Sequence, residues 1–213
     1  MLSFLSSIDK SVSAGVALEE SQRSWRNPLF WLANVGAHLG DSLLWVGITA
    51  LLWRRAGDDP ARKRLLSGWM AAFAGAVAVT LVIKRIFRRP RPGTGQMLYG
   101  PGADVHSFPS GHGARVGVIL VWAETLWPGA GWLAPLIGLW IGWARVAMGI
   151  HYVGDVLAGV VLGWGGWTVG AEGCEGKRRK VGVTSSPSST RRLSATLGER
   201  SSSMRNFTGW RLR

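Results

Sequence analysis

Five apolar stretches, each of about the length needed to cross a lipid bilayer, dominate one predicted membrane domain at residues 29–172. They cover residues 29–53, 65–87, 110–127, 132–148 and 152–171, of which the third is marginal. A transmembrane helix needs about 20 predominantly apolar residues, within a working range of about 17–25. The 30 Gly and 13 Trp suit such helices, because small residues allow close helix contact and Trp gathers at membrane interfaces. The sequence therefore predicts an all-α integral membrane bundle with about five transmembrane helices.

The distribution of basic residues predicts how this bundle is oriented. The loop at residues 54–64 contains five Lys and Arg, and loops rich in these residues stay in the cytoplasm. With five spans, the C-terminal tail falls on the same side, whereas the 88–109 loop and the 149–151 turn fall on the extracytoplasmic side. The cationic cluster at residues 84–91 breaks this charge rule. Either those cations have a function or the number of spans differs.

The two ends of the chain differ from its apolar centre. Residues 1–28 lack the cationic leader and cleavage site of a signal peptide, and Val12, Val16 and Leu18 predict a short amphipathic or interfacial segment. Residues 173–213 contain ten Lys and Arg against two Glu, a net charge of +8, and Ser-rich runs. This composition predicts a disordered cytoplasmic tail. Few aromatic residues accompany the charges, so attraction to anionic lipid is favoured and no nucleic acid partner is expected.

Three short segments, residues 84–92, 108–113 and 144–155, place polar and charged side chains at the ends of these stretches. Ionisable groups at membrane depth are costly and are functional candidates by default. The predicted topology brings all three segments to the same membrane face, so we expect them to be neighbours in the bundle. Eight candidates for a shared site are Lys84, Arg91, Ser110, Gly111, His112, Arg145, His151 and Asp155.

Five of these residues have the chemistry to hold a phosphate group. Lys84 provides a compact positive charge, and Arg91 and Arg145 provide planar guanidinium groups suited to two parallel hydrogen bonds. Ser110 adds a hydroxyl donor. Gly111 lets backbone N–H groups approach closely at the start of a helix, where the positive end of the helix dipole favours an anion.

The other three residues have the chemistry to cleave a phosphate ester. His151 and Asp155 are four residues apart, so on a helix they would share one face, and Asp155 could orient the ring of His151 for attack on phosphorus. His112 could protonate the leaving oxygen. No Cys/His or carboxylate cluster predicts a metal site, and no cofactor is expected, since the cations themselves can stabilise the transferring phosphoryl group.

Each segment also has a purely structural interpretation. The basic cluster could be an interfacial anchor, the Pro-Ser-Gly-His segment a helix cap, and Asp155 a favourable charge at a helix N-terminus. Their joint occurrence, in order and at one membrane face, favours the functional interpretation.

The three segments resemble the signatures of the type-2 phosphatidic acid phosphatase superfamily, which also includes the vanadium haloperoxidases. Those signatures are Lys-x6-Arg-Pro, Pro-Ser-Gly-His and Ser-Arg-x5-His-x3-Asp, and here they begin at Lys84, Pro109 and Ala144. The resemblance implies a helical bundle, a phosphohistidine intermediate on His151 and His112 as the acid. It also implies that the phosphate is surrounded by Lys84, Arg91, Ser110, Gly111, His112 and Arg145.

The sequence departs from these signatures in two places. Ala144 replaces the family's Ser, which removes one hydroxyl donor but keeps the backbone N–H, so we expect a modest effect. Arg89 and Pro90 form a second Arg-Pro pair at the wrong spacing.

Two further groups of polar residues are weaker candidates. Asn34, His38 and Asp41 would share one face of the first stretch, where a polar stripe facing the bundle is favoured over substrate contact. Asp104 and His106 lie in the predicted outer loop and could contact a substrate head group.

We therefore expect an integral membrane phosphatase that acts on a lipid phosphate or polyprenyl diphosphate from the extracytoplasmic face. A vanadate-dependent haloperoxidase is an alternative enzyme, because the same anion pocket could hold vanadate. A non-catalytic lipid-binding membrane protein is the alternative outside enzymes, and the complete set of catalytic side chains argues against it.

Overall fold

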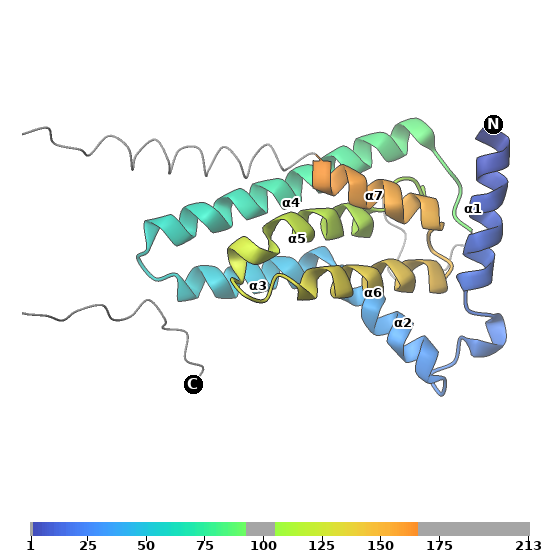
Figure 1. Ribbon diagram of the computed structural model, residues 1–213, viewed down its shortest axis with the longest axis horizontal. Helices are drawn as coiled ribbons and strands as arrows, with labels where there is room; N and C mark the ends of the chain where they lie inside the picture. Colours follow the sequence, from blue (N-terminus) through green and yellow to red (C-terminus); the bar gives the residue numbers. More distant parts are fainter. Residues whose placement is uncertain (1, 93–104, 166–213) are drawn as a thin grey trace, which may run out of the picture.

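The computed structural model describes residues 2–92 and 105–165, and every regular element in this part of the chain is helical. Figure 1 labels the helices in chain order. They are α1 (Leu2–Val16), α2 (Pro28–Leu39), α3 (Ser42–Arg55), α4 (Pro60–Phe87), α5 (Gly111–Leu126), α6 (Leu133–Ala147) and α7 (Val153–Gly165), with a short 3-10 turn at Glu20–Gln22. The all-α prediction is confirmed.

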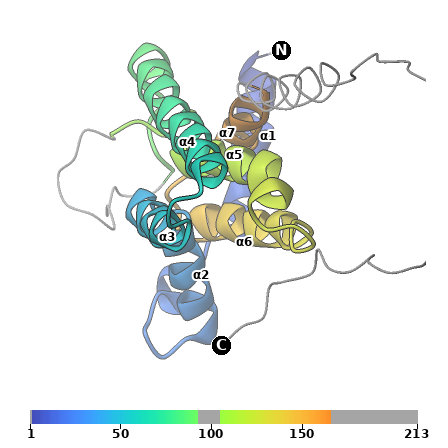
Figure 2. The same cartoon turned by 90° about the vertical axis from the view of Figure 1, so that its left-hand side faces the viewer.

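Helices α3 to α7 run along the long axis of the molecule, and α1 lies across one end of them (Figure 1). Seen from the end, α5 lies in the middle of the bundle with α4, α6 and α7 around it (Figure 2). Most of α5 is buried, including its first residues His112, Gly113 and Ala114. A helix that is buried on all sides fixes its neighbours, so α5 sets the relative positions of the three helices that it contacts.

Glycines allow α5 and α7 to pack at very short range. A Cβ atom added to Gly117 would collide with the carbonyl of Val160, and one added to Gly163 would collide with the carbonyl of Ala114. Small residues at helix interfaces permit this approach. The close packing brings the start of α5 to the start of α7, where the N–H of Ser110 donates to the carbonyl of Asp155 at 2.9 Å.

The first predicted span is broken in the structure. Helices α2 and α3 meet at an angle of 57°, with Gly40 and Asp41 between them. Asp41 is the N-cap residue of α3, a position where Asp is strongly favoured. The single continuous helix expected over residues 29–53 is therefore wrong in detail.

The described residues support fewer spans than the sequence predicted. Helix α4, with 28 residues, is long and apolar enough to cross a membrane, and the bent pair α2–α3 passes the same test if it counts as one span. Helices α6 and α7 are apolar but shorter, and the predicted end of the fifth span at residues 166–171 lies outside the described residues. The molecule has an all-helical membrane fold, and the count of five spans stays a prediction.

Aliphatic side chains on the outside of the bundle suit a hydrocarbon environment. Leu43, Leu139 and Val161 are 85%, 73% and 71% exposed, respectively. They belong to α3, α6 and α7, so apolar surface is spread around the bundle rather than confined to one patch. A soluble monomer rarely exposes large contiguous apolar surface, whereas lipid-facing helices do.

The predicted interfacial segment forms a helix, α1, over residues 2–16. Val12 is half exposed, as expected for an interfacial side chain, whereas Leu18 is buried beside Ala33 and Ala147. Interfacial placement of α1 stays a prediction. The tail at residues 173–213 and the loop residues 93–104 lie outside the described residues.

The topology yields a direct test. In a Cys174→Ser background, single cysteines replacing Asp58 and Val105, both exposed, should react with a membrane-impermeant thiol reagent from opposite sides of the membrane. Asp58 serves better than neighbouring Gly57, whose φ of +52° would strain a cysteine. Labelling of both positions from the same side would contradict the predicted orientation.

Candidate active site

All three segments predicted to form a site meet at one end of the bundle. Lys84 lies in the last turn of α4 and Arg145 in the last turn of α6, whereas Ser110 caps α5 and Asp155 lies in the first turn of α7. Six candidates are at most 9% exposed: Lys84, Ser110, His112, Arg145, His151 and Asp155. Polar groups buried this deeply are costly unless they have partners, so their convergence indicates a function.

The turn between α6 and α7 places His151 directly over the end of α6. The N–H groups of Ile150 and His151 both donate to the carbonyl of Arg145, at 3.1 and 3.2 Å. Gly149 has a φ of +67°, a left-handed conformation that glycine adopts without strain after a helix C-terminus. This local geometry explains why Arg145 and His151, six positions apart, belong to one site.

Cationic groups surround His151. The charges of Arg145, Lys84 and Arg91 all act on its ring. Arg91 also donates to the carbonyl of Ile150 at 3.1 Å, and Lys84 donates to the carbonyl of His106 at 2.9 Å. These contacts orient both cations beside the ring. Three positive charges around a buried imidazole form an electrostatic site for an anion.

Burial, together with the charges of the nearby cations, lowers the pKa of His151 to about 3 against the opposing effect of Asp155. A lowered pKa means that the ring is neutral at physiological pH. A neutral imidazole has a free nitrogen lone pair, as a nucleophile requires.

The pairing of His151 with Asp155 differs from the sequence prediction in one respect. His151 precedes α7 rather than sharing a helical face with Asp155. The distance from His151 Nδ1 to Asp155 Oδ2 is 3.7 Å, too long for a hydrogen bond. The same oxygen accepts the Tyr152 N–H at 3.0 Å. In substrate-free sites such catalytic contacts are often long and tighten on binding.

Ser110 is the N-cap of α5, and its hydroxyl oxygen accepts the N–H of Gly113 at 3.3 Å. The interpretation of the Pro-Ser-Gly-His segment as a helix cap is therefore confirmed. It does not exclude a role in binding, because the N–H groups at this helix start still form a positive end beside the cations.

His112 is held between two residues that the sequence did not assign to it. Its Nε2 lies 3.2 Å from Asp41 Oδ1, and its Nδ1 accepts from Arg115 at 2.8 Å. Arg115 also donates to Ser42 Oγ at 2.8 Å. Since Arg115 can only donate, Nδ1 must accept, which leaves the proton of the neutral ring on Nε2.

Two of the three residues of the polar stripe predicted on the first stretch, His38 and Asp41, belong to this arrangement. His38 Nδ1 contacts Asp41 Oδ2 at 2.9 Å, while the other oxygen of Asp41 faces His112. The helix break at residues 40–41 turns Asp41 toward α5. The spacing of three between His112 and Arg115 was the available signal for their contact, since residues three apart are neighbours on a helix.

Arg89, noted in the sequence only as part of a misplaced Arg-Pro pair, contacts Asp155 at 2.7 Å and Asp9 at 2.8 Å.

Asp104 lies outside the described residues. Within residues 2–92 and 105–165, no group of three His, Cys, Asp or Glu side chains could hold a metal ion.

Comparisons with known proteins show the family to which this chain is similar. A family model described as the PAP2 superfamily matches residues 65–173, which confirms the resemblance inferred from the three motifs. A decaprenylphosphoryl-5-phosphoribose phosphatase of Mycolicibacterium smegmatis is 34% identical over 130 residues, covering 58% of this chain and 67% of that protein. A lipid A 1-phosphatase of Rhizobium etli is 36% identical over 148 residues, covering 60% and 63%. The chain thus spans about two thirds of these relatives.

A similar fold occurs in a solved structure. The transmembrane PAP2-type phosphatidylglycerolphosphate phosphatase from Bacillus subtilis superposes with a TM-score of 0.63 at 24% identity. The similarity covers 81% of this chain and 87% of that one, so it extends over most of the helical bundle.

Proposed function

Because this chain belongs to the PAP2 superfamily, we propose that it is an integral membrane phosphatase that hydrolyses a lipid phosphate or polyprenyl diphosphate through a phosphohistidine intermediate. The observation that supports this most directly is the buried, neutral His151 among the charges of Lys84, Arg91 and Arg145. A structural imidazole would gain little from three neighbouring cations, whereas an anion bound there would be stabilised by all of them.

In the proposed reaction, the phosphate is bound by the three cations, the Ser110 hydroxyl and the N–H groups at the start of α5. The Nδ1 atom of His151 is directed at Asp155, so Nε2 is the nitrogen that attacks phosphorus. As the new P–N bond forms, the P–O bond to the leaving group breaks, and His112 supplies the proton to the leaving oxygen. Water then attacks the phosphohistidine, with His112 taking the proton, and releases phosphate.

Asp41 and Arg115 give His112 a defined orientation for this role. Arg115 occupies Nδ1, so proton transfer must use Nε2, which faces Asp41 in the substrate-free structure. To act as the acid, His112 must carry a proton on both ring nitrogens, so in the proposed complex Arg115 releases Nδ1 and Asp41 stabilises the positively charged ring. The Nε2–H then faces the leaving oxygen, and the ring becomes neutral once that proton is transferred.

The lipid nature of the substrate is supported by the surroundings of the site. The helices that form it have exposed aliphatic side chains on their outer faces, so a lipid can approach from the side while its phosphate reaches the cations. The two relatives described above are named for polyprenyl-linked and lipid A phosphates. We further propose that the site opens on the extracytoplasmic face, opposite the basic 54–64 loop.

The proposal is tested by measuring phosphate release from purified protein against a panel of lipid phosphates and diphosphates in detergent. Release from at least one lipid is expected. Lipid binding without release would favour the non-catalytic alternative. Vanadate should inhibit without supporting halide oxidation, and halide oxidation would favour the haloperoxidase alternative.

Metal removal gives an independent prediction. Because cationic side chains are proposed to neutralise the phosphate, excess EDTA should leave the rate of phosphate release unchanged. The measurement compares kcat before and after chelation and dialysis. Loss of activity in EDTA that a divalent ion restores would contradict the proposed composition of the site.

A further inference from the structure

Helix α7 starts without a cap residue of its own. Its first N–H groups need acceptors from outside the helix, and Tyr152, which precedes it, has no side-chain acceptor suited to that task. Asp155, at the third helical position, reaches back to the Tyr152 N–H at 3.0 Å. This is half of a capping box, and the other half is missing from the local sequence.

Helix α1 supplies the missing acceptors. The Val153 N–H donates to Ser13 Oγ at 2.9 Å, and the Gly154 N–H donates to Asp9 Oδ1 at 2.8 Å. Asp9 and Ser13 are four residues apart, so they lie on the same face of α1. That face packs on the start of α7, immediately after His151 and before Asp155.

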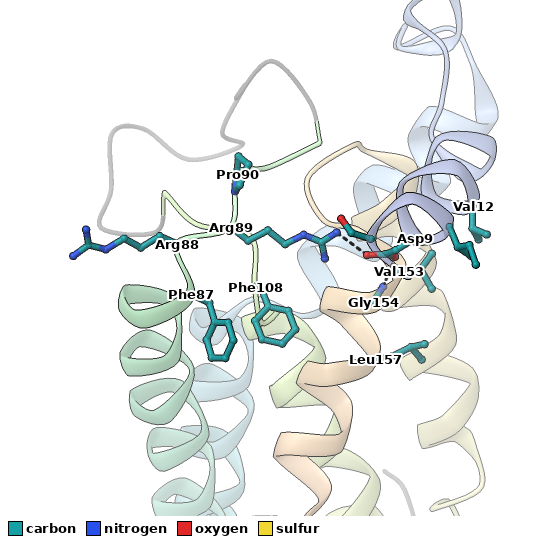
Figure 3. A pocket seen from close by; sticks show the side chains of 12 residues that line it. Asp9, Val12, Phe87, Arg88, Arg89, Pro90, Phe108, Val153, Gly154 and Leu157 are labelled. Atoms are coloured by element: carbon teal, nitrogen blue, oxygen red, sulfur yellow. Dashed lines mark hydrogen bonds and ion pairs between the residues drawn. The ribbon is translucent and has the colours of Figure 1, made fainter. Parts of the chain in front are cut away.

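Asp9 also completes an ionic network with the proposed catalytic carboxylate. Its second oxygen accepts from Arg89 Nη2 at 2.8 Å, while Nη1 of the same guanidinium donates to Asp155 Oδ1 at 2.7 Å. The guanidinium stacks over the Tyr152 ring, 4.0 Å from its centroid. Figure 3 shows Arg89 reaching from the end of α4 across to Asp9 and Gly154.

This bridge borders a cavity of about 760 Å³ between α1, the end of α4 and the start of α7 (Figure 3). Arg89 is only partly buried there. Burial alone would lower the pKa of Arg89, but the hydrogen bonds and charges of Asp9 and Asp155 outweigh it and raise the pKa. Arg89 thus stays cationic, and its orientation depends on having a carboxylate on each side.

We propose that Asp9 is a positioning residue for the hydrolytic site: from α1 it holds Arg89 against Asp155 and holds the first turn of α7, so that Asp155 stays aligned with His151. The inference rests on the proposed function, since it assigns to Asp9 an effect on that same reaction. Asp9 does not contact the reacting groups; it acts through Arg89.

Asp9→Asn separates the two contacts of Asp9. The amide oxygen can still accept the Gly154 N–H, whereas the amide NH₂ cannot accept from Arg89. We expect kcat to fall about 10-fold to 100-fold, the size of effect that a misplacement of about 1 Å produces. KM should stay within about twofold, because substrate contacts are unchanged. If Asp9 only stabilised the fold, Asp9→Asn would instead lower the melting temperature and leave kcat per folded molecule unchanged.

Two matched controls accompany this variant. Asp58→Asn makes the same chemical change at an exposed position in the α3–α4 loop, and Lys10→Gln changes an exposed residue on α1 itself. Both should keep the wild-type kcat. Arg89→Lys tests the bridge from its other end: it keeps the charge but replaces the planar fork with one ammonium group, so kcat should also fall.

The decisive measurement is a double-mutant cycle. In an Arg89→Gln background, Asp9→Asn should have no further effect on kcat. The guanidinium that links Asp9 to Asp155 is already absent in that background. A wild-type kcat in Asp9→Asn or Arg89→Lys, or an equal loss from Asp9→Asn in both backgrounds, would overturn the inference. Absence of phosphate release by the wild-type protein would instead overturn the proposed function, so the two failures are distinguishable.

Discussion

Replacing His151 with alanine should abolish turnover while leaving the fold and lipid binding largely intact. If His151 is the nucleophile, no other group can form the covalent intermediate, and kcat should fall by about 10⁶-fold, as when the nucleophile of a serine protease is removed. Fold retention is expected because Nδ1 of His151 is buried without a hydrogen-bond partner among the described residues, so the substitution breaks no hydrogen bond at that atom. Melting temperature and lipid binding provide the controls.

The intermediate itself can be trapped. Wild-type protein quenched in denaturant during turnover of labelled substrate should retain label that is stable to alkali and released by acid, as expected of a phosphohistidine. His151→Ala should retain none. Full activity in His151→Ala, or label of the same stability in its absence, would contradict the mechanism.

Replacing Asp155 with asparagine should lower kcat far more than it raises KM. The carboxylate contacts neither the phosphate nor the leaving group, so its interaction with His151 grows chiefly as the ring becomes positively charged in the transition state. Removing the orienting Asp of a serine-protease triad costs about 10⁴-fold, and a fall of roughly 10²-fold to 10⁴-fold is expected here. The 3.7 Å separation from His151 should shorten when substrate binds.

The Asn side chain at this position can still accept the Tyr152 N–H, so helix α7 should keep its first turn. Arg145→Ala offers a contrasting variant: its guanidinium is proposed to bind phosphate in the ground state, so KM should rise as well. Steady-state kinetics on protein with an unchanged melting temperature separates the two patterns. A near-normal kcat in Asp155→Asn would show that Asp155 acts only as a charge at a helix end and does not assist His151.

Sequence reasoning predicted the helical bundle and the side chains that converge, for a simple physical reason. The motif residues stand at helix ends, where an apolar stretch stops, and α4 and α6 end at the same end of the bundle where α5 and α7 begin. Lys84 and Arg145 lie in last turns, and Ser110 caps α5, as the pattern implied. The local rules for caps and apolar periodicity act over a few residues and can be read directly.

Other features depend on contacts between residues distant in the chain. The break lies at Gly40 and Asp41, where the carboxylate of Asp41 contacts His38 and also His112, 71 positions away. The apolar composition of residues 29–53 gave no sign of it, because both halves are apolar. The predicted span over residues 29–53 is therefore bent at a polar residue whose partner on α5 is distant in the chain.

By itself, the sequence determined the fold class, the family and the ionisable groups available for chemistry, because these follow from composition and from short-range spacing. Only the tertiary structure decided how those groups are held. Arg89 meets Asp9 across 80 positions and Asp155 across 66, and no local spacing encodes such contacts. They arise because α1 lies across the start of α7 and supplies the hydrogen-bond acceptors that this helix lacks in its own sequence.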